Sequence, residues 1–287
     1  GAYRLSMAKS GSPVGVSQGD EGGELSNGFK HTGAIGTGEI DAWTITATAG
    51  ENILVRMGKT TPSDTLAPFV RIFGPDGVAL DSQFGTAAAE GRATVNKSGT
   101  VLVVVADSSN AKSGTGGYQL TMVRTGAPVS VAPGDEGGPL TNGFTHIGTI
   151  DTGDLDVWTV NATAGDYLMA RVGKAGPGNA LTPWVRLYSP GGALLDDGFG
   201  SAAGEALTRA TVTGTFLVVV GDGTPTRAET GSYRLSLVKT GTPLTISAGD
   251  EGGELINGAE HKGLITVGDL DAWTDRKSTR LNSSHVA

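Results

Sequence analysis

The sequence predicts an all-β protein built from tandem jelly-roll-like β-sandwich domains with a period of 115 residues. Tyr3, Tyr118 and Tyr233 lie 115 residues apart. Residues 118–232 align with the preceding 115 residues without a gap, and 54 positions are identical. Short apolar segments alternate with glycine-rich turns, which is typical of strands rather than helices. A period of this length suits an independent domain and is too long for a solenoid unit.

The expected strands of the first repeat cover residues 43–47, 53–57, 70–73, 78–80, 101–105 and 118–123. Apolar and polar residues alternate in the first two, as in half-buried strands. The GPDG turn joins the third and fourth into a hairpin. The unbroken run VLVVV predicts a central strand that is covered on both sides. The AAAE segment at 87–90 is expected to form one turn of helix.

The repeat also predicts the domain boundaries. They are the closing strand of a truncated preceding repeat at 1–11, sandwiches at 12–126 and 127–241, the truncated start of a third repeat at 242–274, and a tail at 275–287. Residues 275–285 read DRKSTRLNSSH, which resembles a translated sequencing adapter, so the tail is expected to be non-native. The two partial repeats cannot close a core and are expected to expose apolar side chains.

Composition narrows the classes of function. The net charge is −8 and no basic stripe is present, which argues against nucleic acid and anionic membranes as partners. Cysteine is absent, so disulfides and zinc–thiolate sites are excluded. No apolar run is long enough for a transmembrane helix, so no membrane insertion is expected.

Recurring acidic clusters suggest calcium, which prefers several carboxylate and carbonyl oxygens. The clusters lie in the GDEGG loop, in the segment before each repeated tryptophan, and in the LLDDG turn. The candidate ligands are Asp20, Glu21, Glu39, Asp41, Asp135, Glu136, Asp151, Asp154, Asp156, Asp196 and Asp197. Aspartate beside glycine is also ordinary turn chemistry, and no EF-hand pattern is present. Calcium is the one cofactor that the sequence suggests.

Aromatic residues supply candidate ligand contacts. Phe84 and Phe199 each precede a glycine in a predicted loop and could contact a ligand. Phe69 and Trp184 begin equivalent strands, where they could stack on a sugar ring or pack in the core. The repeated tryptophan of the DAWT and DVWT segments is expected in the core.

No catalytic motif is present. Each repeat has one histidine (His31, His146, His261), which is expected to pack on a neighbouring aromatic ring. A hydrolase needs a nucleophile, a base and an orienting group, and no motif brings these together. Glu90 and Glu205 are expected to brace a turn. The prediction is that the protein is not an enzyme.

Several stretches resemble the bacterial pre-peptidase C-terminal (PPC) domain family. They are Gly38 to Trp43, Thr46 to Gly50, Pro68 to Asp81, Gly99 to Val105 and Gly116 to Leu120, with counterparts 115 residues on. The resemblance implies a jelly-roll-like sandwich in an extracellular or cell-surface protein, and an extracellular protein or a polysaccharide as partner. The expected function is a non-catalytic spacer, adhesion or ligand-presenting array, stiffened by calcium. The alternative is an accessory substrate-binding region of a secreted peptidase or other hydrolase.

Overall fold

The computed structural model describes residues 5–275, and this part of the chain contains strands and no helix. The predicted all-β class is confirmed. Most of the predicted tail, residues 276–287, lies outside the described residues, as do residues 1–4. Because residues 5–275 form no helix, this part of the chain has none that could cross a membrane.

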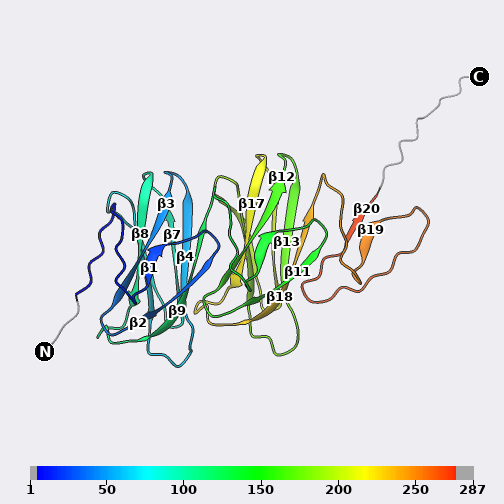
Figure 1. Ribbon diagram of the computed structural model, residues 1–287. Helices are drawn as coiled ribbons and strands as arrows, with labels where there is room; N and C mark the ends of the chain where they lie inside the picture. Colours follow the sequence, from blue (N-terminus) through cyan, green and yellow to red (C-terminus); the bar gives the residue numbers. More distant parts are fainter. Residues whose placement is uncertain (1–4, 276–287) are drawn as a thin grey trace, which may run out of the picture.

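The strands form two complete sandwiches and one partial sheet (Figure 1). The first sandwich contains β1 (Gly22–Glu24), β2 (Lys30–Ile35), β3 (Ile40–Ala47), β4 (Asn52–Lys59), β5 (Pro68–Phe73), β6 (Ala79–Phe84), β7 (Ala88–Thr94), β8 (Gly99–Asp107) and β9 (Gly116–Arg124). The second contains β10 (Gly137–Pro139), β11 (Thr145–Ile150), β12 (Leu155–Ala162), β13 (Tyr167–Lys174), β14 (Pro183–Tyr188), β15 (Leu194–Phe199), β16 (Ala203–Arg209), β17 (Gly214–Asp222) and β18 (Gly231–Lys239). The partial sheet pairs β19 (Gly252–Glu254) with β20 (Ala272–Thr274).

Each sandwich has a five-stranded and a four-stranded sheet. In the first sandwich the orders are β1-β3-β8-β5-β6 and β2-β9-β4-β7, and the second repeats both orders 115 residues on. The run VLVVV lies in β8, between β3 and β5, as predicted for a central strand. The short strand β1 pairs with β3 in parallel, while the longer strands pair antiparallel.

Each sandwich closes its own core. The buried apolar cluster of the first draws Ile45, Val70 and Val103 from one sheet and Val55 and Leu120 from the other. All of its members lie between residues 25 and 122, and the corresponding cluster of the second lies between residues 150 and 237. Because side chains alternate across each strand, one face of each sheet fills the core and the other faces outward.

The expected helical turn at 87–90 is wrong. Residues from Ala88 onward form β7, which pairs with β4 so that Ala89 lies opposite Met57. Ala89 is buried in the core and Glu90 faces outward opposite Arg56. Tertiary pairing overrides the helical propensity of a short alanine run.

The two sandwiches stack in the same orientation (Figure 1). We call the outer face of each four-stranded sheet its downstream face and the outer face of each five-stranded sheet its upstream face. The downstream face of the first sandwich meets the upstream face of the second, and we call this contact the joint. Leu54 and Val123 of the first sandwich form one buried apolar cluster with Leu155, Tyr188 and Val219 of the second.

The backbones approach closely at one edge of the joint. A Cβ atom on Gly58 would lie 2.6 Å from the Cα atom of Gly153 and would also collide with the carbonyl oxygen of Thr152. Glycine is therefore required at Gly58 by close approach rather than by its backbone angles.

Residues 242–275 follow the second sandwich and contain the two short strands β19 and β20. Leu255, Ile256, Leu264 and Ile265 are exposed in this segment.

Candidate functional site

Three acidic clusters form where the GDEGG loop meets the start of the following long strand. The parallel pairing of β1 with β3 places Gly22 opposite Ala42, which brings the loop carboxylates beside Asp41. In each cluster the three carboxylates lie within 4.8 Å of one another. The clusters are Asp20, Glu21 and Asp41; Asp135, Asp154 and Asp156; and Asp250, Glu251 and Asp271.

A buried chain of hydrogen bonds orients the central carboxylate. The indole Nε1 of Trp43 donates to the hydroxyl of Tyr118 (3.1 Å), and that hydroxyl donates to Oδ2 of Asp41 (2.6 Å). Trp158, Tyr233 and Asp156 repeat this arrangement in the second sandwich. The repeated tyrosine and tryptophan therefore position the carboxylate as well as filling the core.

Among residues 5–275, no lysine or arginine forms an ion pair with the first cluster. Asp41 is only 1% exposed, and its Oδ1 atom is buried without a hydrogen-bond partner. Burial raises the pKa of Asp41 to about 7, against the hydrogen bond from Tyr118, and the carboxylates of Asp20 and Glu21 add to the rise. A cation beside this group would stabilise its charged form.

In the second cluster a lysine from the first sandwich supplies the cation. The amine of Lys30 lies 2.9 Å from Oδ2 of Asp154 and 3.0 Å from Oδ1 of Asp135. Burial opposes the charge of the amine, but the two carboxylates outweigh it and raise the pKa of Lys30. Burial also raises the pKa of Asp154 to about 6, although Lys30 works in the opposite direction.

In the part of the chain that the structure describes, no amine pairs with the third cluster. Thr145 occupies the position 115 residues after Lys30, and its hydroxyl donates to Oδ2 of Asp250 over 3.1 Å. Asp250, Glu251 and Asp271 were not among the ligands predicted from the sequence. They lie 115 residues after Asp135, Glu136 and Asp156, and this spacing was the signal that could have found them.

The other candidate ligands lie apart from these groups of three. Glu39 accepts a hydrogen bond from the Gly36 amide over 2.6 Å, and the Asp151 carbonyl accepts one from the Asp154 amide. Asp196 accepts from the Leu207 amide. Glu136 belongs to the GDEGG loop, and burial raises its pKa. The predicted LLDDG turn is wrong, because this segment lies in strand β15, and its aspartates do not join the acidic clusters.

The four candidate aromatic contacts lie in different settings. Phe84 and Phe199 are 75% and 62% exposed at the ends of edge strands β6 and β15. Phe69 is half-buried on the upstream face of the first sandwich, opposite Phe84 in the strand register. Trp184 is 9% exposed and lies in the joint, where its Nε1 donates to Asp197 over 2.7 Å.

The three histidines pack as expected. His31 meets Phe29 and Trp43 edge to face, with ring centroids 5.3 and 5.2 Å apart. Its Nε2 atom accepts a hydrogen bond from the Ser26 amide. Its lone pair is therefore already used, and burial lowers the pKa of His31.

An ion cluster that was not predicted from the sequence lies at the centre of the joint. The side chain of Glu90 is 2% exposed, and its carboxylate meets Arg56 of its own sandwich at 2.5 Å. It also meets Arg186 of the second sandwich at 3.1 Å and Arg92 at 2.6 Å, with Arg227 at 3.8 Å. Burial opposes the charge of Glu90, but the four guanidinium groups outweigh it and hold the pKa of this carboxyl well below its usual range. We call these five residues the Glu90 clamp.

Trp184 braces the clamp from the second sandwich. The guanidinium carbon of Arg186 lies 4.1 Å from the centre of the Trp184 ring, and those of Arg92 and Arg227 lie 5.3 and 5.2 Å away. Stacking on an aromatic face supports guanidinium groups that lack a second carboxylate. The joint therefore concentrates positive charge around one carboxylate and one indole.

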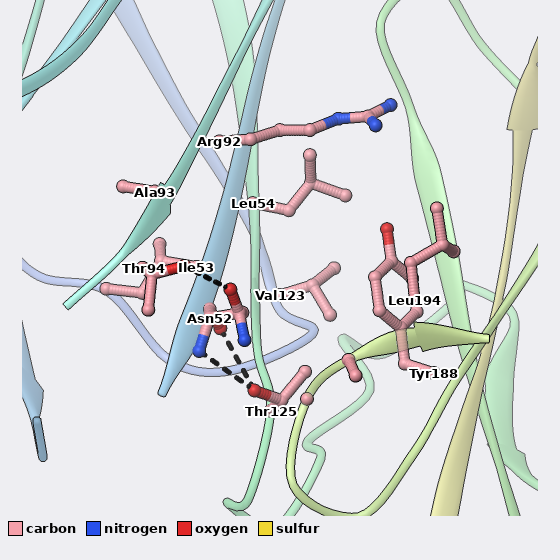
Figure 2. Close-up of a pocket in the computed structure, with 12 residues that line it drawn as sticks. Asn52, Ile53, Leu54, Arg92, Ala93, Thr94, Val123, Thr125, Tyr188 and Leu194 are labelled. Atoms are coloured by element: carbon pink, nitrogen blue, oxygen red, sulfur yellow. Dashed lines mark hydrogen bonds between the residues drawn. The ribbon is translucent and has the colours of Figure 1, made fainter. Parts of the chain in front are cut away.

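A cleft opens beside the apolar part of the joint, with a volume of about 230 Å³. Asn52, Leu54 and Val123 line it from the first sandwich, and Tyr188 and Leu194 line it from the second (Figure 2). The backbone N–H of Asn52 donates a hydrogen bond to the Thr125 hydroxyl over 3.0 Å. The joint is thus closed at the clamp and open at this edge.

No protein-family model matches the sequence, and a search of curated proteins found no match. Among solved structures, the PPC domain of collagenase from Bacillus anthracis is 17% identical, with a TM-score of 0.28, over 36% of this chain and 95% of that one. The tandem CBM22 domain of a Paenibacillus barcinonensis protein is 11% identical, with a TM-score of 0.22, over 74% of this chain and 86% of that one. Tandem CBM51 modules of a Streptococcus pneumoniae family 98 glycoside hydrolase are 9% identical, with a TM-score of 0.24, over 71% of this chain and 81% of that one. Similarities of this size carry no argument about ligand or activity.

Proposed function

We propose that this chain is a non-catalytic extracellular spacer array in which stacked β-sandwiches form a stiff rod. The observation that carries the proposal is the Glu90 clamp. A string of independent domains would keep its charges in water, because burying them costs several kcal/mol each unless they are paired. Here Arg56 and Arg186, from different sandwiches, share one buried carboxylate. The contact between Arg186 and Glu90 holds only while the two sandwiches stay together.

Three further contacts support a fixed joint. Nη1 of Arg56 donates to the carbonyl of Asp154 (3.1 Å), and Lys30 reaches across to the second acidic cluster. The side-chain amide of Asn27 donates to the carbonyls of Arg124 and Pro128, which ties the connecting segment to the first sandwich. Domains move relative to one another unless their interface is large and hydrophobic. The buried apolar cluster that includes Leu54 and Tyr188 supplies that apolar contact beside these polar ones.

The test is a distance measurement between spin labels on Lys97→Cys and Val212→Cys, equivalent exposed positions in the two sandwiches. The absence of natural cysteine makes labelling specific. A stiff joint gives one narrow distance distribution. A broad distribution in the otherwise unaltered chain would exclude the stiff rod.

We also propose that the first and third acidic clusters bind a divalent cation, calcium being the ion whose oxygen preference fits. Asp20, Glu21 and Asp41 would hold it in the first, and Asp250, Glu251 and Asp271 in the third. The fit rests on the buried, unpartnered Oδ1 atoms of Asp41 and Asp271 and on the amine of Lys30, which supplies a cation to Asp135 and Asp154 in the second cluster. Oδ1 of Asp156 in the second cluster is unpartnered as well, so the amine is what distinguishes that cluster. A bound cation would neutralise charge and tie the connecting loop to the following strand.

A thermal melt with chelator and then with calcium tests this proposal. Calcium at about 100 times Kd contributes about 2.7 kcal/mol. For a domain of this size, that raises the melting temperature by about 10 °C. The control is Asp41→Asn, which should lose the response of the first sandwich. An unchanged melting temperature in the starting protein would remove calcium from the proposal.

The exposed phenylalanines favour a second candidate function, binding of polysaccharide by an accessory region of a secreted hydrolase. Phe84 and Phe199 recur at the same edge of successive sandwiches, and aromatic faces stack on sugar rings. Two weak sites on a rigid body would bind a polymer more strongly than either alone. Retention on insoluble polysaccharides should fall for Phe84→Ala, and further when Phe199→Ala is added. Equal retention of all three proteins would exclude this role.

A further inference from the structure

We propose that the cleft beside the joint binds a small organic acid, whose carboxylate pairs with Arg92 and whose body lies between the two sandwiches. This role goes beyond that of a spacer. The residues that line the cleft all lie between Asn52 and Leu194, within the two complete sandwiches. Its walls therefore do not depend on the segments that precede and follow them.

The cleft has a cationic end, apolar walls and a polar end. Arg92 lies at one end and Asn52 at the other, while Leu54 and Val123 lie between them and face Tyr188 of the second sandwich (Figure 2). Arg92 is the one charged side chain among the described residues that line the cleft. Sites for drug-sized ligands measure roughly 300–1,000 Å³, so this smaller cleft suits a molecule with a single ring.

The cleft borders a surplus of positive charge. The Glu90 clamp holds four guanidinium groups around Glu90, and Asp197 is a second carboxylate beside them. This surplus lies in a chain whose net charge is −8. A ligand carboxylate at the edge of the clamp would form charge-assisted hydrogen bonds, which are stronger than those between neutral groups.

Arg92 brings this charge to the cleft. Its Nε and Nη2 atoms donate to Oε1 of Glu90 over 2.9 and 2.6 Å. Within residues 5–275 its Nη1 atom has no hydrogen-bond partner, and the side chain is 44% exposed. Asp81 accepts from the backbone amide of Arg92 and does not line the cleft. The donors on Nη1 are therefore available to a ligand carboxylate.

The hydroxyl of Tyr188 is the second observation that points to a ligand. Tyr188 is only 8% exposed and lines the cleft, and no group within residues 5–275 forms a hydrogen bond with its hydroxyl. The hydroxyl of a buried tyrosine usually finds a partner. Phe73 occupies the equivalent position in the first sandwich, so the strand does not need the hydroxyl for packing. An oxygen atom of a bound ligand would supply the missing partner.

Asn52 offers further donors at the opposite end of the cleft. Its Oδ1 atom accepts from the Thr94 hydroxyl over 2.7 Å, which fixes the orientation of the amide. Its Nδ2 atom has no hydrogen-bond partner in the part of the chain that the structure describes. A Cβ atom on Gly192 would lie 2.9 Å from Nδ2, so the turn of the second sandwich closes this end. A ligand with a carboxylate at one end and an oxygen acceptor along its body therefore matches the cleft.

These polar groups are particular to this joint. Tyr167 and Leu207 take the places of Asn52 and Arg92 in the second sandwich. The equivalent surface of the second sandwich therefore lacks both the cation and the amide. The repeat thus supplies two natural substitutions for the test, Arg92→Leu and Tyr188→Phe.

Titration of the isotope-labelled full chain with benzoate, followed by its backbone amide chemical shifts, tests the proposal. Benzamide is the neutral probe of the same shape. For a ligand of this size we expect a Kd of about 1 mM, with the largest shifts at Asn52, Thr94 and Gly192. Benzamide should bind about tenfold more weakly, because it cannot form the charge-assisted contact. Glucuronate, with glucose as its neutral control, presents the same carboxylate on a sugar ring, and the tighter of the two acids identifies the body that fits.

The variants separate the two ends of the contact. Arg92→Leu should weaken binding of the acid about tenfold or more, and Tyr188→Phe about threefold. Tyr188→Phe removes only a hydroxyl, so it decides together with benzamide if Arg92→Leu does not fold.

Arg209→Leu is the matched control, since it makes the same substitution as Arg92→Leu at an exposed position that does not line the cleft. It should leave the affinity unchanged, and a thermal melt of each variant shows whether it is folded. Failure of both acids to bind at millimolar concentration would overturn the proposal. So would equal affinity for benzoate and benzamide, shifts that lie away from the cleft, or a folded Arg92→Leu variant that binds as Arg209→Leu does.

Discussion

Replacing Glu90 by glutamine removes the single negative charge from the clamp and leaves four guanidinium groups facing one another. The side chains of Arg56 and Arg186 are fully buried, so water cannot screen them. Loss of one partner from a buried ion pair typically costs about 3–5 kcal/mol. Burial already lowers the pKa of Arg56 to about 10, and repulsion from Arg186 and Arg227 contributes despite the attraction of Glu90.

The clamp lies between two closed cores, so the repulsion among the guanidinium groups can be relieved without unfolding either core. Opening the joint returns the guanidinium groups to water and leaves each core intact. The cost of Glu90→Gln should therefore appear mainly as separation of the sandwiches. In the spin-label measurement the narrow distance should broaden, and in urea the joint should be lost before the cores unfold.

Glu205→Gln is a matched control. Glu205 occupies the equivalent position in the second sandwich and pairs with Arg171, but both side chains are about one-third exposed. An ion pair of this exposure contributes about 0–1 kcal/mol. If the two substitutions cost the same, or if Glu90→Gln leaves the distance distribution narrow, then the clamp does not hold the joint.

The clamp also predicts a pH dependence. The pKa of Glu90 is depressed below its ordinary value of 4.5, so its contribution to stability is complete above that pH. It is lost as the pH falls from 4.5 through the folded-state pKa, because the unfolded chain takes up the proton first. The acid limb of a pH–stability profile should be shallower in Glu90→Gln than in the starting protein. Parallel acid limbs would contradict the assignment.

Lys30→Thr should destabilise the metal-free protein and increase the rise in melting temperature that calcium causes. Thr145→Lys should abolish the contribution of the third cluster to that rise. If neither variant changes the rise, the comparison of the clusters is wrong. The raised pKa of Asp41, about 7, means that the folded chain keeps a proton that the unfolded chain loses above about pH 4. Metal-free stability should therefore fall as the pH rises from about 4 to about 7, and Asp41→Asn should remove this slope in urea unfolding. Gly58→Ala should broaden the spin-label distances without lowering the stability of either core, because its new methyl group meets Gly153 across the joint.

The fold class could be predicted because each strand shows its own local pattern of apolar and polar residues. The VLVVV run identified β8 as a central strand, which lies between β3 and β5, and the alternation in residues 43–47 identified β3. The AAAE segment failed because its helical propensity is local, whereas its pairing with β4 is not. Propensity and pattern agree in the central strands and conflict at this edge.

The candidate site is formed by residues that lie far apart in the sequence, so their contacts could not be predicted from local motifs. The GDEGG loop and the segment before Trp43 were both recognised as acidic, but their meeting required the parallel register of β1 on β3. Lys30 lies 124 residues before Asp154, and no motif joins them. Glu90 was read as the brace of a turn because its partner Arg186 is 96 residues away, in the next repeat.

The differences between the repeats matter most where they lie on contact surfaces. The hydrogen-bonded chain of tryptophan, tyrosine and aspartate is identical in both sandwiches. At the faces, however, Lys30 becomes Thr145 and Arg92 becomes Leu207. The first change removes the amine that neutralises an acidic cluster, and the second replaces a charge with apolar surface. The joint described here is therefore held by the chain's own ion pairs, whereas the next contact along the stack would depend more on apolar burial and a bound cation. One repeated fold can thus give successive joints that respond differently to calcium and salt.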